Sequence, residues 1–485
     1  DRSRGLGDVY KRQTMNEMEV ISHLNVSVGL FPFTKILNLN IDHGPNVFGL
    51  CTIVGEMDHE SADEIAQRTD ESSETEVVTT ASGQPARLFC GVVKNVSVNH
   101  QNEYAKVTVV LEGTCKKLDI QTHQRSYQDT TATYGDLIRK SISGEGTAEI
   151  TVTDKQTGQL IVQYDETNWD FCIRMASQLG APVFSDVQAD EPHLYVGLPP
   201  SDQVKDLSTA EFQMAKSTMS NQMQTGKIVV SEDASDAGLK SYCYVFAGNF
   251  VKVDARFYAV KSISAEMKDG ILEMNYGLLP MGNEAPTAGA TTDVKGLAVS
   301  AGVNQNCSGK MFTGTVKNVS GSKVQVQFSF DSEFSGNHWF EYSTAYSSSD
   351  QSGWYCMPEV GDTVRVFFPS GNEGQAFASS SAPRFMGQSP KDKVWMAHGK
   401  CIQLTEKGIK ISCDGEEAFI DLTPDEGITI SCKKDLNVNA EGEVKVQAET
   451  IKLIADEKIS LGTDRAFIDI TDETITLLGK EVIVE

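Results

Sequence analysis

Residues 428–461 read ITISCKKDLNVNAEGEVKVQAETIKLIADEKISL, and the order of apolar and polar residues in this stretch decides the fold of the C-terminal part of the chain. Two apolar residues are separated by a single residue, which is polar in most cases. Such pairs recur with a step of seven to nine residues from position 428 onward. Further pairs precede and follow the quoted stretch. The whole series is Ile402/Leu404, Ile409/Ile411, Ile420/Leu422, Ile428/Ile430, Leu436/Val438, Val444/Val446, Ile451/Leu453, Ile459/Leu461, Ile468/Ile470, Ile475/Leu477 and Val482/Val484.

Each unit of this series predicts a short strand with one apolar face, followed by a turn of Gly, Asp, Asn or Glu-Lys. A single strand of this kind cannot bury its apolar face, so the strands must stack and close around a shared interior. A step of about eight residues is too short for one chain to complete a three-walled coil, so we predict that three chains wind into an intertwined trimeric β-helix. The alternatives are a single-chain β-helix, for which the step is too short, and a β-meander, for which it is too regular.

The predicted core of this trimer consists of the apolar residues that recur on one face of the needle from position 428 onward. They are Ile428, Ile430, Leu436, Val438, Val444, Val446, Ile459, Leu461, Ile468, Ile470, Ile475 and Leu477. Such a needle has no exposed side edges and no long loops, so it resists compression and aggregation. These are the properties of a piercing tool.

The N-terminal part begins with residues unlike the rest of the chain. Residues 1–14, DRSRGLGDVYKRQT, are basic and lack apolar periodicity, so we interpret them as a cloning artefact or tag and place the natural start at Met15 or Met18. From Ile21 to about Gly113, short alternating runs separated by Gly, Asn, Asp and Ser predict antiparallel strands. The acidic interval 58–76 interrupts this pattern and is predicted to be a mobile surface loop.

Two windows with helical periodicity follow, at 134–142 and 167–179. In the second window, Thr167 can cap the start of the helix and Gly180 can end it. Strand patterns resume after this helix. We therefore predict that residues 15–285 form an α+β domain dominated by β structure.

The composition changes to Ala, Thr, Gly and Pro near Pro286, which predicts a linker over residues 286–305. Residues 306–382 then contain five candidate strands, which suit a small Greek-key barrel of the OB type. Residues 383–485 form the predicted needle, so the fold class is mainly β. The candidate barrel strands are Met311 to Lys317, Ser322 to Phe330, Trp339 to Tyr342, Thr363 to Phe368 and Gly374 to Ser379.

The formal net charge of −25 argues against nucleic acid or an anionic membrane surface as the main partner. The ten cysteines lack paired spacing and fit buried free thiols of a reducing compartment, and the eight histidines lie at no ligand spacing, so we predict no metal and no cofactor. No apolar run approaches the roughly 20 residues of a membrane-spanning helix. No secretory signal peptide is recognised.

Pairs of neighbouring carboxylates are candidates for the acid and base of a glycosidase. The pairs are Asp165/Glu166, Glu416/Glu417 and Asp472/Glu473. Such chemistry needs a cleft, whereas these pairs fall at a helix start or in turns, so we expect them to be solvated and predict no catalytic residue.

Two segments carry a resemblance to a known family. The first is YDETNWDFCIRMASQLG at 164–180, with Glu166, Trp169, Phe171, Arg174 and Gly180, which looks like the family's ET-D/N-W-E/D-F segment. The second is GWYCMPEVGDTVRVFF at 353–368, which is similar to the family's P-x-V-G-D-x-V stretch; its matching residues are Pro358, Gly361 and Asp362. With the order of domains, these segments resemble the VgrG and phage tail-spike (late control protein D) family.

The resemblance implies a structural spike and hub of a contractile injection system, such as a phage tail, a tailocin or a type VI-like machine. It implies a homotrimeric hub of barrel subdomains with pseudo-sixfold symmetry, on which tail tube and baseplate proteins assemble, and an OB neck. The needle would carry a separate PAAR-like tip protein and contact the target membrane only transiently. Assembly would take place in the bacterial cytoplasm, and sheath contraction would replace catalysis.

The chain departs from some members of this family. Only about twenty residues separate the barrel from the first apolar pair, so we expect no lysozyme domain there, and we expect no effector after Glu485. The histidine pairs that bind iron at some phage spike tips are missing. A cell-wall hydrolase delivered by a tail and a receptor-binding fibre remain the alternative functions.

Overall fold

The computed structural model describes residues 20–200, 204–207, 211–216, 222–224, 227–229, 235–282, 297, 299–334, 336–350, 352–381, 389 and 391–483. The predicted tag, most of the predicted linker and Val484 of the apolar series lie outside these residues. The chain divides into two compact units, Asp1–Pro383 and Arg384–Glu485.

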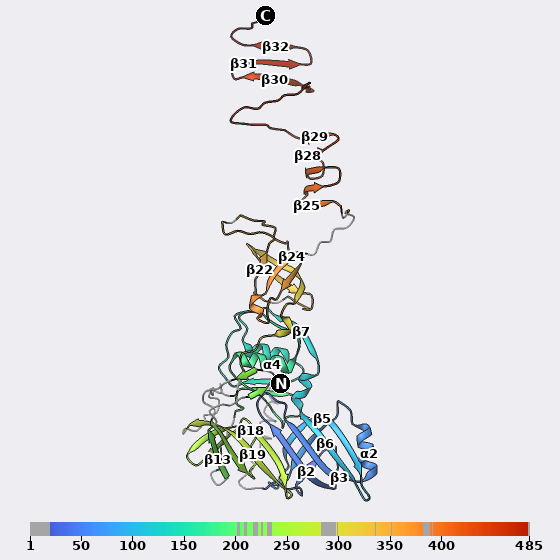
Figure 1. The fold of residues 1–485 in the computed structure, drawn as a ribbon, viewed down its shortest axis with the longest axis vertical. Helices are drawn as coiled ribbons and strands as arrows, with labels where there is room; N and C mark the ends of the chain where they lie inside the picture. Colours follow the sequence, from blue (N-terminus) through green and yellow to red (C-terminus); the bar gives the residue numbers. More distant parts are fainter. Residues whose placement is uncertain are drawn as a thin grey trace. The chain divides into compact units, whose positions relative to one another are not determined.

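A twelve-stranded, mainly antiparallel sheet dominates the first unit (Figure 1). In β6 every second residue is buried, as the alternating sequence pattern predicts. The main path of the sheet is β1 (Val26–Val28), β4 (Glu74–Thr79), β5 (Ala86–His100), β6 (Ala105–Gly113), β3 (Leu50–Met57), β2 (Lys35–His43), β18 (Arg256–Lys268), β19 (Ile271–Gly282), β16 (Ser235–Ser241) and β13 (Glu211–Lys216), with β12 (Lys205–Asp206) and β17 (Phe250–Val253) beside it.

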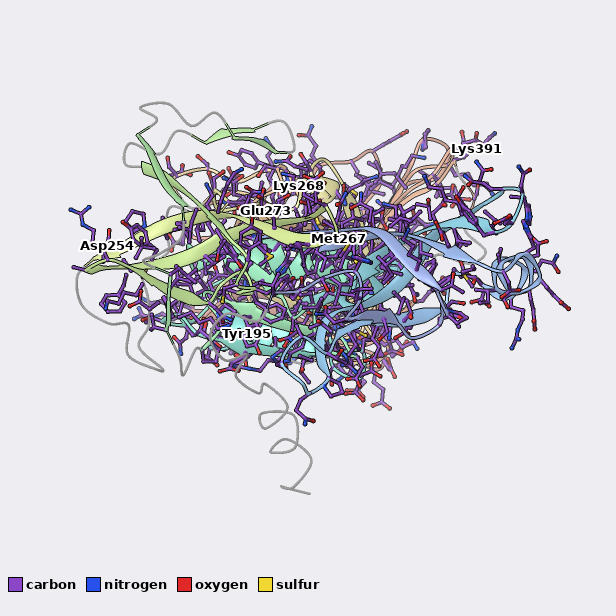
Figure 2. The ribbon with its side chains drawn as sticks, turned by 90° about the horizontal axis from the view of Figure 1, so that it is seen from below. Tyr195, Asp254, Met267, Lys268, Glu273 and Lys391 are labelled. Carbon is purple, nitrogen blue, oxygen red and sulfur yellow. The ribbon has the colours of Figure 1, made fainter. Side chains whose placement is uncertain are left out.

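The long hairpin of β18 and β19 joins two halves of this sheet. Ile263 of β18 pairs with His43 of β2, so a segment far along the chain extends the sheet that the N-terminal strands begin. Near the turn of the hairpin, Lys268 lies beside Glu273 (Figure 2), with Lys268 Nζ 3.0 Å from Glu273 Oε1. The neighbouring Met267 is buried in the core, so adjacent residues of β18 face opposite sides of the sheet.

The prediction of a mobile loop over residues 58–76 is wrong, because this interval contains helix α2 (His59–Arg68) and the start of β4. The side chain of Asp58 caps the helix by accepting a hydrogen bond from the Ser61 backbone N–H at 2.9 Å. An ion pair of 2.8 Å between Glu64 and Arg68 spans one turn. Only Ala62 of the helix is buried, so local polar interactions replace the apolar stripe that reveals most helices in a sequence.

A second core lies between helices and small sheets, and it confirms both predicted helices. Helices α3 (Tyr134–Ser141) and α4 (Asn168–Gln178) bury Leu137, Ile138, Trp169 and Phe171 in this core. The surrounding elements are η1 (Thr114–Asp119), β7 (Thr122–Tyr127), β8 (Thr147–Ile150), β9 (Ile161–Thr167), β10 (Val183–Ser185) and β11 (His193–Val196), and β14 (Gln222–Gln224) and β15 (Lys227–Val229) form a separate hairpin.

Helix α4 begins and ends at the predicted residues. The Thr167 hydroxyl accepts a hydrogen bond from the Asp170 backbone N–H at 3.1 Å, which satisfies one free donor of the first turn. Gly180 has a φ of +67°, and the backbone N–H of Ala181 donates to the Ala176 carbonyl at 3.1 Å, which closes a Schellman motif. The chain therefore leaves the helix in a direction that requires a left-handed backbone conformation at residue 180.

The five strands that follow close into a barrel, as predicted for residues 306–382. Strand β22 pairs in parallel with β24, and all other neighbours are antiparallel, which is the strand arrangement of an OB fold. Its interior contains Phe312, Phe328, Phe340 and Phe368. The order around the barrel is β20 (Met311–Ser320), β21 (Lys323–Phe328), β22 (Phe340–Ser343), β24 (Phe377–Ser381) and β23 (Thr363–Phe367), flanked by η3 (Gln305–Cys307) and η4 (Glu373–Gln375).

The second unit consists of two antiparallel meanders separated by a segment without strands. Each meander is formed by hairpins within one chain, so the β-meander that we set aside describes the pairing inside these two blocks. The first meander contains β25 (Lys393–Ala397), β26 (Lys400–Leu404), β27 (Ile409–Cys413), β28 (Ala418–Thr423) and β29 (Gly427–Cys432), and the second contains β30 (Lys458–Thr463), β31 (Ala466–Thr471) and β32 (Ile475–Leu478).

Candidate functional site

A buried cluster of charges forms around Arg174 of α4. The guanidinium binds Glu166 in a bidentate manner, with Nε to Oε1 and Nη2 to Oε2 both at 2.8 Å. Its Nη1 donates to Glu373 Oε1 at 2.8 Å, and Nη2 also donates to the Val162 carbonyl at 2.9 Å. Since Arg174 is 7% exposed and Glu373 3% exposed, these ion pairs are almost fully shielded from water.

The electrostatics of this cluster depend on the loss of water. Burial raises the pKa of Glu166, and the hydrogen bonds and charge of Arg174 offset this effect only in part. Burial alone would lower the pKa of Arg174, but its hydrogen bonds and charge attraction to Glu166, together with Glu373, outweigh burial and raise it. The guanidinium therefore stays charged and neutralises one of the two carboxylates.

The charge cluster connects the OB barrel to the helical region that contains β9 and α4. Glu166 lies near the end of β9 and Arg174 lies within α4, whereas Glu373 comes from η4 between the last two barrel strands. Leu160 and Val162 of the β9 region belong to the hydrophobic core of the barrel itself. A guanidinium that two separate regions share can be satisfied only when both are in place.

Further polar contacts reinforce this junction. Gln128 Nε2 donates to the Val326 carbonyl at 2.9 Å, and the Ser126 backbone N–H donates to Asp331 Oδ1 at 2.8 Å. Asn304 Nδ2 donates to the Val162 carbonyl at 3.1 Å. The helical region and the barrel therefore belong to one compact unit.

The other predicted motif residues around α4 also support the fold. Trp169 packs against Phe48 with the rings tilted and their centroids 4.5 Å apart, and it thereby connects the helix to the loop before β3. Phe171 is fully buried and packs on Tyr127 at 5.3 Å. These two aromatic side chains hold α4 from both sides, so they are residues of the core.

Pro358, Gly361 and Asp362 form the turn that leads into barrel strand β23. The Asp362 side chain accepts from the Glu359 backbone N–H at 2.8 Å, and Gly361 has a φ of +96°. Gly361 N–H donates to the Val316 carbonyl at 2.9 Å, and Val316 N–H donates to the Asp362 carbonyl at 2.9 Å. The motif thus sets the register between β23 and β20.

Sequence reasoning missed Glu373, Gln128 and Asn304. An acidic residue between Asn372 and Gly374 has the pattern of a solvated turn, and nothing in the sequence indicates that this turn faces Arg174. The partner is separated from Arg174 by 199 residues along the chain. No local signal could have identified it.

Both loops with which OB folds usually bind oligonucleotides or oligosaccharides contact other parts of this chain. The loop between β23 and β24 contains Glu373, which is bound by Arg174. The turn between β20 and β21 receives a hydrogen bond of 2.9 Å from the Tyr355 hydroxyl to the Gly321 carbonyl.

The second unit presents two columns of apolar side chains on one face of the first meander. Strand register places Ile402, Ile411, Ile420 and Ile430 directly opposite one another from strand to strand. A parallel column consists of Leu404, Ile409, Leu422 and Ile428. The second meander repeats this arrangement, with Ile459, Ile470 and Ile475 in one column and Leu461, Ile468 and Leu477 in the other.

The predicted trimer-core residues are exposed in the single chain. Ile428 is 71% exposed and Ile430 is 57% exposed, and of the twelve predicted residues only Ile459 is partly covered. No residue from 391 to 483 is buried. This is a large apolar surface that one chain cannot cover by itself, and such surfaces mark sites of association.

Within the residues that the structure describes, no group of three or more His, Cys, Asp or Glu side chains could hold a metal ion. In the same part of the chain, no helix has the length and apolar character needed to cross a membrane. The ten cysteines are all free thiols, of which Cys51, Cys115, Cys172 and Cys307 are fully buried.

Comparisons with known families match two parts of the chain. Residues 64–231 match the family model described as phage tail baseplate hub (GPD). Residues 312–382 match the family model described as type VI secretion system/phage-baseplate injector OB domain. The second match covers the closed barrel, and a search of curated proteins finds no match.

Solved structures with a similar fold include the Francisella PdpA–VgrG complex. Its half-lidded form has a TM-score of 0.51 at 8% identity, covering 89% of this chain and 91% of that chain. Its lidded form has a TM-score of 0.50 at 9% identity, with coverages of 82% and 76%. The E. coli c3393 protein, a component of the type VI secretion system, has a TM-score of 0.48 at 12% identity, with coverages of 74% and 99%.

Proposed function

We propose that the chain is a member of the VgrG and phage baseplate-hub family of contractile injection machines, and that it is a homotrimeric hub and spike that nucleates the tail tube and pierces a target envelope. The proposed layout is a hub at residues 15–285, a linker at 286–305, an OB neck at 306–382 and a triple-stranded needle at 383–485. The machine is a phage tail or a type VI-like apparatus.

The exposed apolar columns of the second unit carry this proposal. Full burial of one Ile, Leu or Val side chain contributes about 1.5–3 kcal/mol, so twelve of them contribute at most roughly 18–36 kcal/mol per chain. Ordering the three chains costs conformational entropy, so only part of this gain remains as net stability of the trimer. Three copies around one axis can turn these faces inward together, which one copy cannot do.

The junction around Arg174 supports the mechanical part of the proposal. A spike must transmit thrust from the hub to the needle without bending between them. The shared guanidinium, the hydrogen bonds of Gln128 and Asn304, and the common apolar core hold the neck in one orientation on the helical region. A buried network of this kind favours one arrangement over its alternatives.

A structural role without catalysis is part of the proposal. In the candidate pair Asp165/Glu166, Glu166 is occupied by Arg174 at 2.8 Å, and Glu416 binds Lys410 at 3.1 Å. Two of the three pairs therefore contribute carboxylates to ion pairs, and Glu166 is buried, so the expectation that the pair Asp165/Glu166 is solvated is wrong for Glu166. We further propose that the hub binds tail tube and baseplate proteins, that a separate PAAR-like tip protein caps the needle, and that assembly takes place in the bacterial cytoplasm.

The mass of the native particle tests this proposal. Light scattering after size-exclusion chromatography should give three times 52.9 kDa for the chain. Replacing Ile428 and Ile430 by Asn should weaken the trimer, whereas the same change at Thr429 and Ser431, on the polar face of the same strand, should leave it intact. A monomeric parent chain would refute the trimeric spike, and release of sugar or peptide from purified cell wall would favour a hydrolase.

A further inference from the structure

Two histidines and one aspartate meet where helix α2 lies beside the end of strand β5 (Figure 1). His59 is the first residue of α2, Asp63 lies about one turn further along the same helix, and His100 is the last residue of β5. His59 Nδ1 lies 2.7 Å from His100 Nδ1, and His100 Nε2 lies 3.0 Å from Asp63 Oδ1. The edge of the His100 ring that carries both nitrogens therefore faces the helix.

The two imidazole rings meet edge to edge. Their planes differ by 26°, and their centroids lie 4.9 Å apart. This centroid distance is close to the largest that a 2.7 Å contact between the Nδ1 atoms allows, so the two nitrogens point toward each other. The side chains of His100 and Asp63 are 48% and 53% exposed, so dissolved ions can reach the pair.

Asp63 determines which nitrogen of His100 carries the proton. An ionised carboxylate can only accept hydrogen bonds, so we place the proton of neutral His100 on Nε2, which donates to Asp63. Nδ1 of His100 then keeps its lone pair and directs it at His59. A carboxylate that holds one ring N–H and thereby orients the other nitrogen is the usual support of a metal-bound histidine. Asp63 is therefore a positioning residue, and the site has two ligand nitrogens.

The surroundings of the two histidines favour a cation. Helix α2 contains three carboxylates, those of Glu60, Asp63 and Glu64, against the single basic residue Arg68. A local excess of negative charge raises the concentration of cations nearby. The helix also lacks apolar anchors, since Ala62 is its only buried residue. A bridge between its first turn and β5 would therefore hold it on the sheet where apolar packing does little.

We propose that His59 and His100 bind one divalent transition-metal ion through their Nδ1 atoms, and that this ion fastens α2 to β5. Imidazole nitrogen suits Zn²⁺, Ni²⁺ and Cu²⁺, whereas Mg²⁺ and Ca²⁺ prefer oxygen ligands. Zn–N bonds of about 2.0–2.1 Å in a tetrahedral site place two nitrogens roughly 3.3 Å apart, so the two exposed rings must separate slightly when the ion enters. Water takes the remaining positions.

The site lies in the first unit and does not depend on the proposed trimer. Because 41 residues separate the two histidines along the chain, their spacing gives no sign of it. A hydrogen bond between the two histidines is the alternative explanation of their contact, and that arrangement requires no metal.

Calorimetric titration of the full chain with Zn²⁺ distinguishes the two. The parent chain should bind one Zn²⁺ that Mg²⁺ does not displace. His59→Gln and His100→Gln should each weaken this binding at least about tenfold. His123→Gln, which changes a histidine of β7, should bind Zn²⁺ like the parent. A parent chain without Zn²⁺ binding, or binding that survives both substitutions unchanged, would overturn the metal site.

The variant Asp63→Ala tests the positioning role. It keeps both ligands, so Zn²⁺ affinity should fall by about 10- to 100-fold, whereas the melting temperature without Zn²⁺ should stay close to that of the parent. Equal affinity in this variant and the parent would refute that role.

Hydrogen exchange tests whether the ion fastens α2. Saturating Zn²⁺ should slow the exchange of amides 59–68 about tenfold in the parent and leave it unchanged in His100→Gln. Unchanged exchange in the parent at saturating Zn²⁺ would overturn the bridge between α2 and β5.

Discussion

Replacement of Arg174 by Met should destabilise the first unit strongly, because it leaves Glu166 and Glu373 buried without a cation. Removing one partner of a buried ion pair costs about 3–5 kcal/mol, far more than the net value of the intact pair. The methionine fills a similar volume, so the loss reflects charge more than a cavity. For a unit of this size we expect a decrease in melting temperature of about 5–10 °C, measured by calorimetry.

A compensating variant isolates the cause of this loss. Changing Glu166 and Glu373 to Gln in the Arg174→Met background removes the unpaired charges while it preserves side-chain size. This triple variant should recover more than half of the lost melting temperature. An Arg174→Lys variant keeps the charge but loses the bidentate geometry, so its stability should lie between those of the parent and the Met variant.

The pH dependence of the Arg174→Met variant gives an independent check. Burial already raises the pKa of Glu166 above its ordinary value of 4.5, and loss of the guanidinium raises it further. Between the pKa of Glu166 in the unfolded chain and its higher pKa in the folded variant, the folded chain holds a proton that the unfolded chain releases. The free energy of unfolding of the variant therefore falls as pH rises through this range. The deficit relative to the parent should be smaller at pH 5 than at pH 8. A deficit below about 0.5 kcal/mol, or one that is independent of pH, would refute the role of buried charge.

Three further changes test other parts of the structure. Burial lowers the pKa of His43 to about 4, against the opposing effects of Asp186 and Ser185, so on acidification the unfolded chain binds a proton before the folded chain does. The free energy of unfolding should therefore fall by about 3 kcal/mol from pH 6.5 to pH 4. In calorimetry, the stability of His43→Gln should depend less steeply on pH. Gly180→Ala should cost about 1 kcal/mol because the φ of +67° disfavours a Cβ, whereas Asn should be tolerated better; equal urea midpoints would contradict this. Asp58→Ala should cost about 1 kcal/mol through the lost cap of α2, visible as faster amide exchange over residues 59–62.

Local features of the fold could be predicted because their causes lie within a few residues. Helix α4 was predicted from Thr167 to Gly180, since both its cap and its stop are determined by adjacent groups. The five barrel strands were predicted to within a few residues because alternation of apolar side chains is a local pattern. Helix α2 was missed because its stability comes from a cap and an ion pair, and it has almost no apolar face to detect.

The sequence by itself determined that the C-terminal part repeats an apolar pair and that one copy of it cannot bury these side chains. It also determined the motif residues around Trp169, Arg174 and Gly361, although not what they contact. Only the tertiary structure decided that Arg174 meets Glu373, 199 residues away, and that the repeat folds back into hairpins in two blocks but stays unpaired between them. The physical reason is that periodicity specifies which face of a strand is apolar, whereas the partner of a strand or a charge is chosen by long-range geometry, which the order of residues along the chain does not display.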